Sequence, residues 1–167
     1  MRMIALRRSV VFASIVSLLG ISSLGCGGPS GPDGMPELHP TILTITQGGA
    51  PLEGASVQLV STDPTLSRWA CGGSSDAMGQ VVISTLGQYP GAAAGTYKVT
   101  VFKELMETTG PANADPAASS VTKGFALVDP KYQTAETTPA SVTITAGENK
   151  PPAIELGAPV KIAAPNL

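Results

Sequence analysis

Residues 96–103 read Thr-Tyr-Lys-Val-Thr-Val-Phe-Lys, which is the most regular pattern in the chain. Tyr97, Val99 and Val101 fall on one side of an extended backbone, and the threonines and the first lysine fall on the other. Strict alternation of apolar and polar residues is typical of a half-buried β-strand. This stretch therefore predicts a strand with one face in a hydrophobic core.

Short strand patterns recur on both sides of this stretch and are separated by glycine-rich turns. Together with it, the expected strands lie near residues 43–46, 56–59, 69–73, 81–83, 141–145 and 153–156. Residues 47–55 are expected to connect antiparallel partners, and residues 75–79 and 146–150 to close hairpins. The chain holds 19 glycines and 15 prolines. The pattern predicts an all-β, seven-stranded antiparallel β-sandwich over residues 41–156.

Residues 104–138 interrupt the strand pattern with glycine, prolines and isolated apolar residues. A structureless loop of this length is unusual in a compact domain. We therefore expect an insertion there, with a short helical turn around residues 121–127. Residues 157–167 are expected to form a tail, in which residues 160–162 could pair at a sheet edge.

The first 25 residues have the composition of an export signal, and we expect a signal helix there. Arg2, Arg7 and Arg8 precede an uncharged apolar run over residues 9–24. The run ends in Ser-Leu-Gly-Cys at residues 23–26, which resembles the lipobox of bacterial lipoproteins and implies cleavage before Cys26 and lipidation of its thiol. Two alternatives stay open: secretion through another peptidase, and an uncleaved membrane anchor, for which the run is short.

Residues 26–40 are rich in glycine and proline and are expected to form a flexible linker after the lipidated Cys26. Two or more acyl chains hold a protein stably on a bilayer. The expected location is therefore extracytoplasmic, on the cell membrane or the outer membrane, with the periplasmic face favoured.

The charge of the chain limits the kinds of partner that it can bind, and its cysteine content limits the disulfides that it can form. Residues 26–167 carry seven Lys or Arg against twelve Asp or Glu, and the lysines are scattered, so no nucleic acid is expected as a partner. If Cys26 is lipidated, Cys71 is left without a cysteine partner, and we expect a small buried residue. A Cys26–Cys71 disulfide would be possible only without lipidation.

Three motifs together resemble the carboxypeptidase regulatory-like domain. They are Gly-Gly-Ala-Pro-Leu-Glu-Gly-Ala-Ser-Val at 48–57, Ser-Asp-Ala-Met-Gly-Gln at 75–80 and Ala-Gly-Thr-Tyr-Lys-Val-Thr-Val at 94–101. The resemblance implies a transthyretin-like (prealbumin-like) sandwich used as an accessory module. It gives Gly54, Asp76, Gly79 and Gly95 structural roles in turns. Residues 127–132, 141–144 and 147–149 are similar to the end of small bacterial lipoproteins built on this sandwich.

The chain offers little catalytic chemistry. Its single histidine, His39, lies in the expected linker, and one histidine with one free cysteine cannot make a closed zinc site. We expect no catalytic residues, metal or cofactor. Trp69 is more often core at such a position, but with Arg68 it could stack on a sugar.

The leading hypothesis is a non-enzymatic cell-envelope lipoprotein that presents its sandwich for structural or protein-interaction roles, with an unknown envelope protein as its partner. The alternative is a module that binds envelope glycans, and a hydrolase is the third reading.

Overall fold

The computed structural model describes residues 31–109 and 121–163, which belong to one compact unit that starts at Gly31. The expected signal peptide over residues 1–25, the lipidation site Cys26 and the last four residues of the tail lie outside the described residues.

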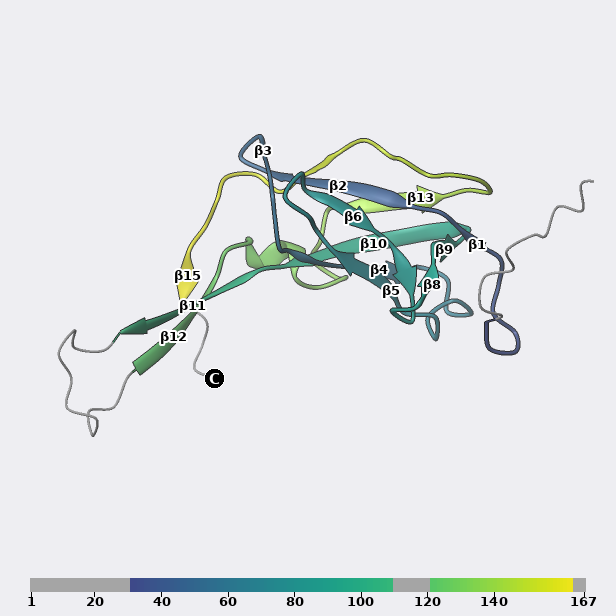
Figure 1. The fold of residues 1–167 in the computed structure, drawn as a ribbon, viewed down its shortest axis with the longest axis horizontal. Helices are drawn as coiled ribbons and strands as arrows, with labels where there is room; N and C mark the ends of the chain where they lie inside the picture. Colours follow the sequence, from purple (N-terminus) through teal and green to yellow (C-terminus); the bar gives the residue numbers. More distant parts are fainter. Residues whose placement is uncertain (1–30, 110–120, 164–167) are drawn as a thin grey trace, which may run out of the picture. The chain divides into compact units, whose positions relative to one another are not determined.

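The larger of two facing sheets is antiparallel and has the predicted strand 96–103 near its middle. Its order is β13 (Ser141–Ile144), β10 (Gly95–Phe102), β4 (Ser56–Ser61), β5 (Cys71–Ser74), β7 (Ser84–Thr85) and β8 (Tyr89–Pro90). In this register Val99 of β10 lies opposite Leu59 of β4. Figure 1 shows β10 as the longest of these strands.

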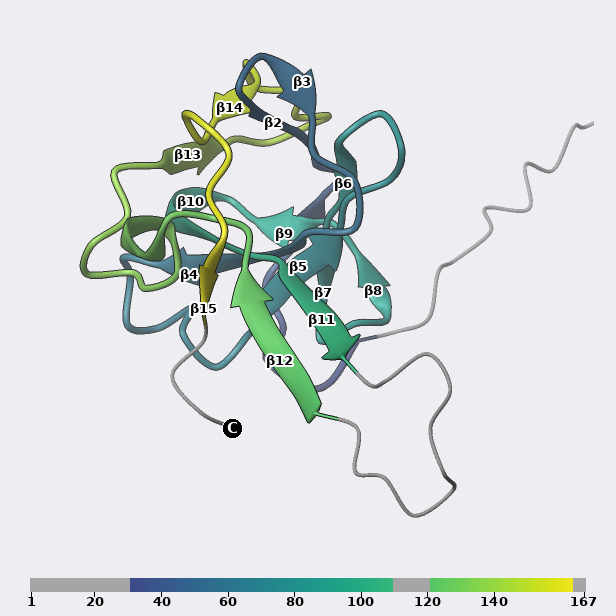
Figure 2. The same ribbon diagram turned by 90° about the vertical axis from the view of Figure 1, so that its left-hand side faces the viewer.

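The smaller sheet is built around β2 (Ile42–Gln47). The strands β6 (Gln80–Val82) and β3 (Ala50–Pro51) pair with it antiparallel, whereas β14 (Ile154–Glu155) pairs with it parallel. Figure 2 shows β2, β3 and β14 as one layer above β4, β5 and β10.

The inward side chains of both layers meet in one hydrophobic core, and Leu43, Ile45, Val99 and Val101 are fully buried there. Burial of such a side chain contributes about 1.5–3 kcal/mol. The prediction of an all-β fold is confirmed, and two sheets around one core are consistent with a β-sandwich.

None of the three predicted hairpins pairs its two strands as expected. At the turn over residues 75–79 only the isolated bridge between Ser75 and Val81 joins the two sides, because β5 pairs with β4 and β7 while β6 pairs with β2. The strands β2 and β4 lie in different sheets, and β13 and β14 are likewise separated: β13 pairs with β10 and β14 with β2. Alternation identifies the face that a strand buries but not its hydrogen-bonding partner. Both sheets of a sandwich point apolar side chains into the core, so two consecutive strands show the same alternation whether they lie in one sheet or in two. Here short turns carry the chain from one sheet to the other.

The expected insertion contains an antiparallel arm rather than a helical turn. The strand β11 (Glu104–Thr109) pairs along its whole length with β12 (Val121–Ala126), and β15 (Ile162–Ala163) adds to β12. The ammonium group of Lys161 lies 2.6 Å from the carboxylate of Glu107 and 4.4 Å from the ring centre of Phe125. The helical turn predicted for residues 121–127 is therefore wrong, while the tail does pair at a sheet edge.

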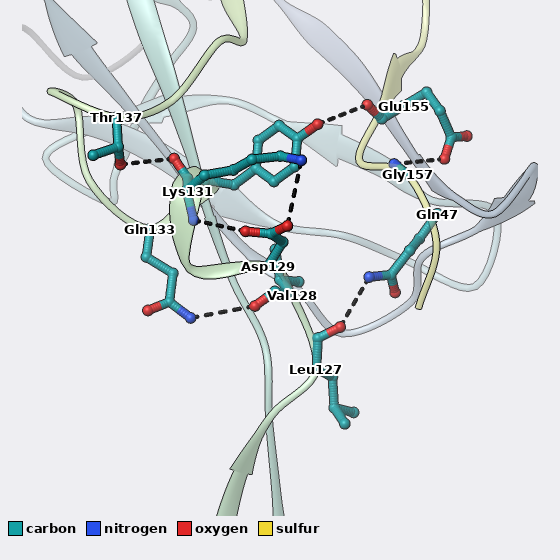
Figure 3. A network of polar contacts seen from close by, with 10 residues as sticks. Gln47, Leu127, Val128, Asp129, Lys131, Gln133, Thr137, Glu155 and Gly157 are labelled. Carbon is teal, nitrogen blue, oxygen red and sulfur yellow. Dashed lines mark hydrogen bonds and ion pairs between the residues drawn. The ribbon is translucent and has the colours of Figure 1, made fainter. Parts of the chain in front are cut away.

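A folded connection follows the arm and closes one side of the core (Figure 3). It contains the 3-10 helix η1 (Pro130–Tyr132), whose Tyr132 is buried. The side-chain amide of Gln47 donates to the carbonyl oxygen of Leu127 at 2.9 Å. The carboxylate of Asp129 accepts from the Lys131 N–H, which lowers the pKa of Asp129. Ordered residues thus replace much of the structureless insertion predicted for 104–138.

The last ten residues of the expected flexible linker also belong to the folded unit. The strand β1 (Leu38–His39) pairs with β9 (Ala92–Ala93), and the Met35 N–H donates to the carbonyl oxygen of Pro32. His39 is only 8% exposed, and its Nδ1 accepts from the Gly147 N–H. Pairing with β9 overrides the glycine- and proline-rich composition that predicted flexibility.

Candidate functional site

The exposed face of the larger sheet carries a groove of about 520 Å³ across β4, β5 and β7. Its floor carries Gln58, Gly72 and Ser84, which lie side by side in the strand register, and Val60, which lies on the same face of β4 as Gln58 and is 39% exposed. A Cβ atom on Gly72 would come within 2.5 Å of the Val57 carbonyl oxygen, so close strand packing keeps this part of the floor bare. Among the described residues, those that line the groove carry no charge.

One wall of the groove is the loop over residues 62–70, held by local hydrogen bonds. The Leu66 N–H donates to the Asp63 carbonyl oxygen and the Trp69 N–H to that of Leu66. The Asp63 carboxylate accepts from the backbone N–H and the hydroxyl of Thr65, which lowers the pKa of Asp63. The loop therefore holds Leu66 and Trp69 at the edge of the groove.

The tight turn between β7 and β8 also lines the groove and lies beside the loop, because the Leu86 N–H donates to the Ala70 carbonyl oxygen at 2.7 Å. This turn contains an unusual leucine. Leu86 and Gly87 have φ values of 53° and 72°, and the Gln88 N–H donates back to the Thr85 carbonyl oxygen. Positive φ at both central residues is typical of a type I′ turn, which favours Asn-Gly. Leu86 is the one non-glycine residue with positive φ in the described ranges, and it is 39% exposed.

The structure brings Arg68 and Trp69 together, as the sequence analysis paired them, but it covers the indole. Trp69 is 9% exposed, and the Arg68 guanidinium lies 4.8 Å from the centre of its ring. Arg68 also donates to the Gly34 carbonyl oxygen at 3.3 Å. The ring therefore offers the groove little area for stacking.

Two groups considered for chemistry are buried in structural positions. The Cys71 thiol donates to the Trp69 carbonyl oxygen at 3.1 Å, and burial raises its pKa. His39, which was expected in a mobile linker, lies in β1 and does not line the groove. Cys71 does belong to the lining of the groove, but it is buried there with its thiol engaged in this hydrogen bond.

The predicted turn residues lie at turns or strand starts. Oδ1 of Asp76 accepts from the N–H groups of Met78 and Gln80, each at 2.8 Å. Gly79 has a φ of 73°, and a Cβ atom there would lie 2.4 Å from the Ile45 carbonyl oxygen. Gly54 has a φ of 67°, while Gly95 begins β10.

Sequence reasoning missed Gln58, Ser84 and Leu86 as groove residues. Gln58 and Ser84 carry no sequence signal for a site, since polar residues are expected on the outer face of any strand. Leu86 does carry one, because Leu-Gly occupies a tight turn where Asn-Gly would be favoured.

In the part of the chain that the structure describes, no three His, Cys, Asp or Glu side chains cluster as metal ligands. Within the same ranges, the structure has no helix with the length and hydropathy needed to span a bilayer. No protein-family model, curated protein or solved structure matches the chain.

Proposed function

We propose that this protein is a non-enzymatic cell-envelope lipoprotein, tethered through Cys26, that binds an uncharged segment of a partner protein in the groove on β4, β5 and β7. The lipobox-like residues 23–26 support the anchor. The uncharged lining, which combines polar groups such as Gln58 with the apolar side chains of Val60 and Leu86, supports the type of ligand.

Leu86 is the observation that carries this proposal. A bulky residue in the left-handed region costs about 1–2 kcal/mol, and such strain tends to persist at functional sites. The side chain is covered only in part, because it is 39% exposed beside the groove. A strained, exposed leucine is accounted for if its side chain contacts a bound partner.

For the fold, we further propose a seven-stranded, transthyretin-like sandwich of the carboxypeptidase regulatory-like type. The backbone roles of Gly54, Asp76 and Gly79 support this assignment, because these motif residues occupy turns with positive φ or side-chain-to-backbone hydrogen bonds. Such a module acts as a scaffold, which agrees with a binding role.

Photo-crosslinking in the native envelope tests the function. A photo-crosslinking amino acid replaces Gln58 on the groove floor, and a matched one replaces Val82, which is 66% exposed on β6 of the other sheet. We expect a discrete protein adduct from position 58 that is absent from position 82 and is lost on Leu86→Asn. Equal adducts from both positions, or an adduct unaffected by Leu86→Asn, would contradict binding in the groove.

A glycan ligand is the second candidate, favoured by the presence of Trp69 and several hydroxyl groups along the groove. Stacking on Trp69 would require Arg68 to move off the ring. Under this alternative, Arg68→Ala strengthens binding of envelope glycan fragments and position 58 gives no protein adduct.

A further inference from the structure

The folded unit begins at Gly31, which is nearer to Cys26 in the sequence than the composition of residues 26–40 predicts. The turn at Pro32–Met35, the Arg68–Gly34 contact and the β1–β9 pairing fix the path of the backbone from Gly31 to His39. Only residues 27–30 lie between the proposed lipid anchor at Cys26 and this unit. A fully extended chain advances at most about 3.6 Å per residue, so this connection spans no more than about 18 Å.

So short a connection restricts which end of the molecule can meet the bilayer. The chain enters the folded unit at Gly31, beside the Pro32–Met35 turn. The loop over residues 62–70 lies at the same end, because Arg68 of this loop donates to the Gly34 carbonyl oxygen. In Figure 1 the arm made by β11 and β12 lies at the other end of the described unit.

We propose that the end formed by residues 31–35 and the loop over residues 62–70 faces the lipid headgroups, and that the β11–β12–β15 arm points away from the membrane. This inference rests on the proposed lipid anchor at Cys26. The carboxylates of Asp33 and Asp63 outnumber the guanidinium of Arg68 on the two facing segments. The surface therefore fits zwitterionic headgroups better than a strongly anionic layer.

The orientation also restricts which part of a partner protein can bind in the groove. The loop over residues 62–70 is both part of the membrane-facing end and one wall of the groove. A polypeptide in the groove thus lies beside the bilayer surface, as the membrane-proximal segment of another envelope protein would.

Headgroup quenching in vesicles tests the orientation. The lipidated full-length protein is reconstituted into phosphatidylcholine vesicles that contain spin-labelled headgroups, with a fluorophore on Asp33→Cys or, as the distal comparison, on Met106→Cys. Both side chains are exposed, and Met106 lies on β11 of the arm. We expect quenching at position 33 to be several-fold greater than at position 106. A flexible 20-residue Gly/Ser insertion after Ser30 should remove most of that difference.

The outcomes separate the inference from the anchor. If the protein floats with the vesicles but quenching is equal at the two positions, or is unchanged by the insertion, the orientation is wrong and the anchor stands. If the protein does not float with the vesicles, the anchor is wrong and the orientation falls with it. In cells, the same insertion should lower the adduct yield from position 58, and an unchanged yield would contradict a membrane-proximal partner.

Discussion

The phenol of Tyr97 donates a hydrogen bond to the carbonyl oxygen of Ala93 at 2.9 Å, although its side chain is only 1% exposed. Tyr97 thus ties the core strand β10 to the strand β9 that precedes it, and β9 in turn pairs with β1. Because the buried hydroxyl donates this hydrogen bond, both removal of the hydroxyl and its ionisation should change the stability of the fold.

Replacing Tyr97 with Phe should lower the free energy of unfolding by about 1–2 kcal/mol, because the Ala93 carbonyl oxygen loses its donor. Burial, followed by the negative charges of Cys71 and Asp63, raises the pKa of Tyr97 to about 12. The fold favours the neutral phenol, so this stability is complete below about pH 10 and is lost as the pH rises towards about 12. Urea unfolding from pH 9 to pH 12 should show a smaller loss for Tyr97→Phe; parallel losses would refute the assignment.

Gly79→Ala should destabilise the protein far more than Gly87→Ala. Both glycines have φ values close to 70°, so each substitution costs about 1 kcal/mol of backbone strain. At Gly79 the new Cβ would also meet the Ile45 carbonyl oxygen at 2.4 Å, whereas nothing lies within 4 Å at Gly87. We expect a loss of about 3 kcal/mol or more at Gly79 by chemical denaturation. Equal losses at the two sites would mean that the close approach of this turn to β2 is not as described.

Leu86→Asn should raise the free energy of unfolding by about 1 kcal/mol, because asparagine adopts positive φ more easily and Asn-Gly suits the turn. The comparison variant Leu86→Ala removes the apolar side chain but keeps a residue that disfavours this conformation, so its stability should change little. A loss of stability in Leu86→Asn would show that Leu86 stabilises the fold rather than serving a partner.

Trp69 is the only tryptophan in the chain, so its fluorescence reports on one position. Because it is 9% exposed beneath Arg68, acrylamide should quench it weakly in the folded protein and strongly after unfolding. Trp69→Ala should cost about 3–5 kcal/mol, whereas Arg68→Ala should cost less than about 1 kcal/mol. Strong quenching in the folded state would instead indicate an open ring suited to sugar stacking.

The sequence predicted the strand cores well because alternation is a local property. Val99 and Val101 of β10, Leu43 and Ile45 of β2, and Ile144 of β13 are all buried as their patterns indicate. The turn at Asp76 and Gly79 was also predictable, since its side-chain-to-backbone hydrogen bonds lie within five residues.

Pairing between strands was not predictable in the same way. Ile154 lies opposite Ile45 in a parallel register, 109 positions away in the chain, and nothing in its neighbours distinguishes this from a hairpin with β13. The arm was missed because its outward residues, such as Leu105 and Met106, are apolar and exposed on both faces, which hides the alternation. The groove could not be predicted either, because it depends on how β4, β5 and β7 are aligned with one another, and that alignment is set by the fold.

Intact-mass analysis of the protein extracted from the membrane fraction tests the central claim most directly. The account predicts a mature chain that begins at Cys26 and carries the added mass of its acyl groups, and it predicts that Cys26→Ser abolishes both the added mass and the membrane association. A chain that begins elsewhere, or one that begins at Cys26 without acyl groups, would contradict it.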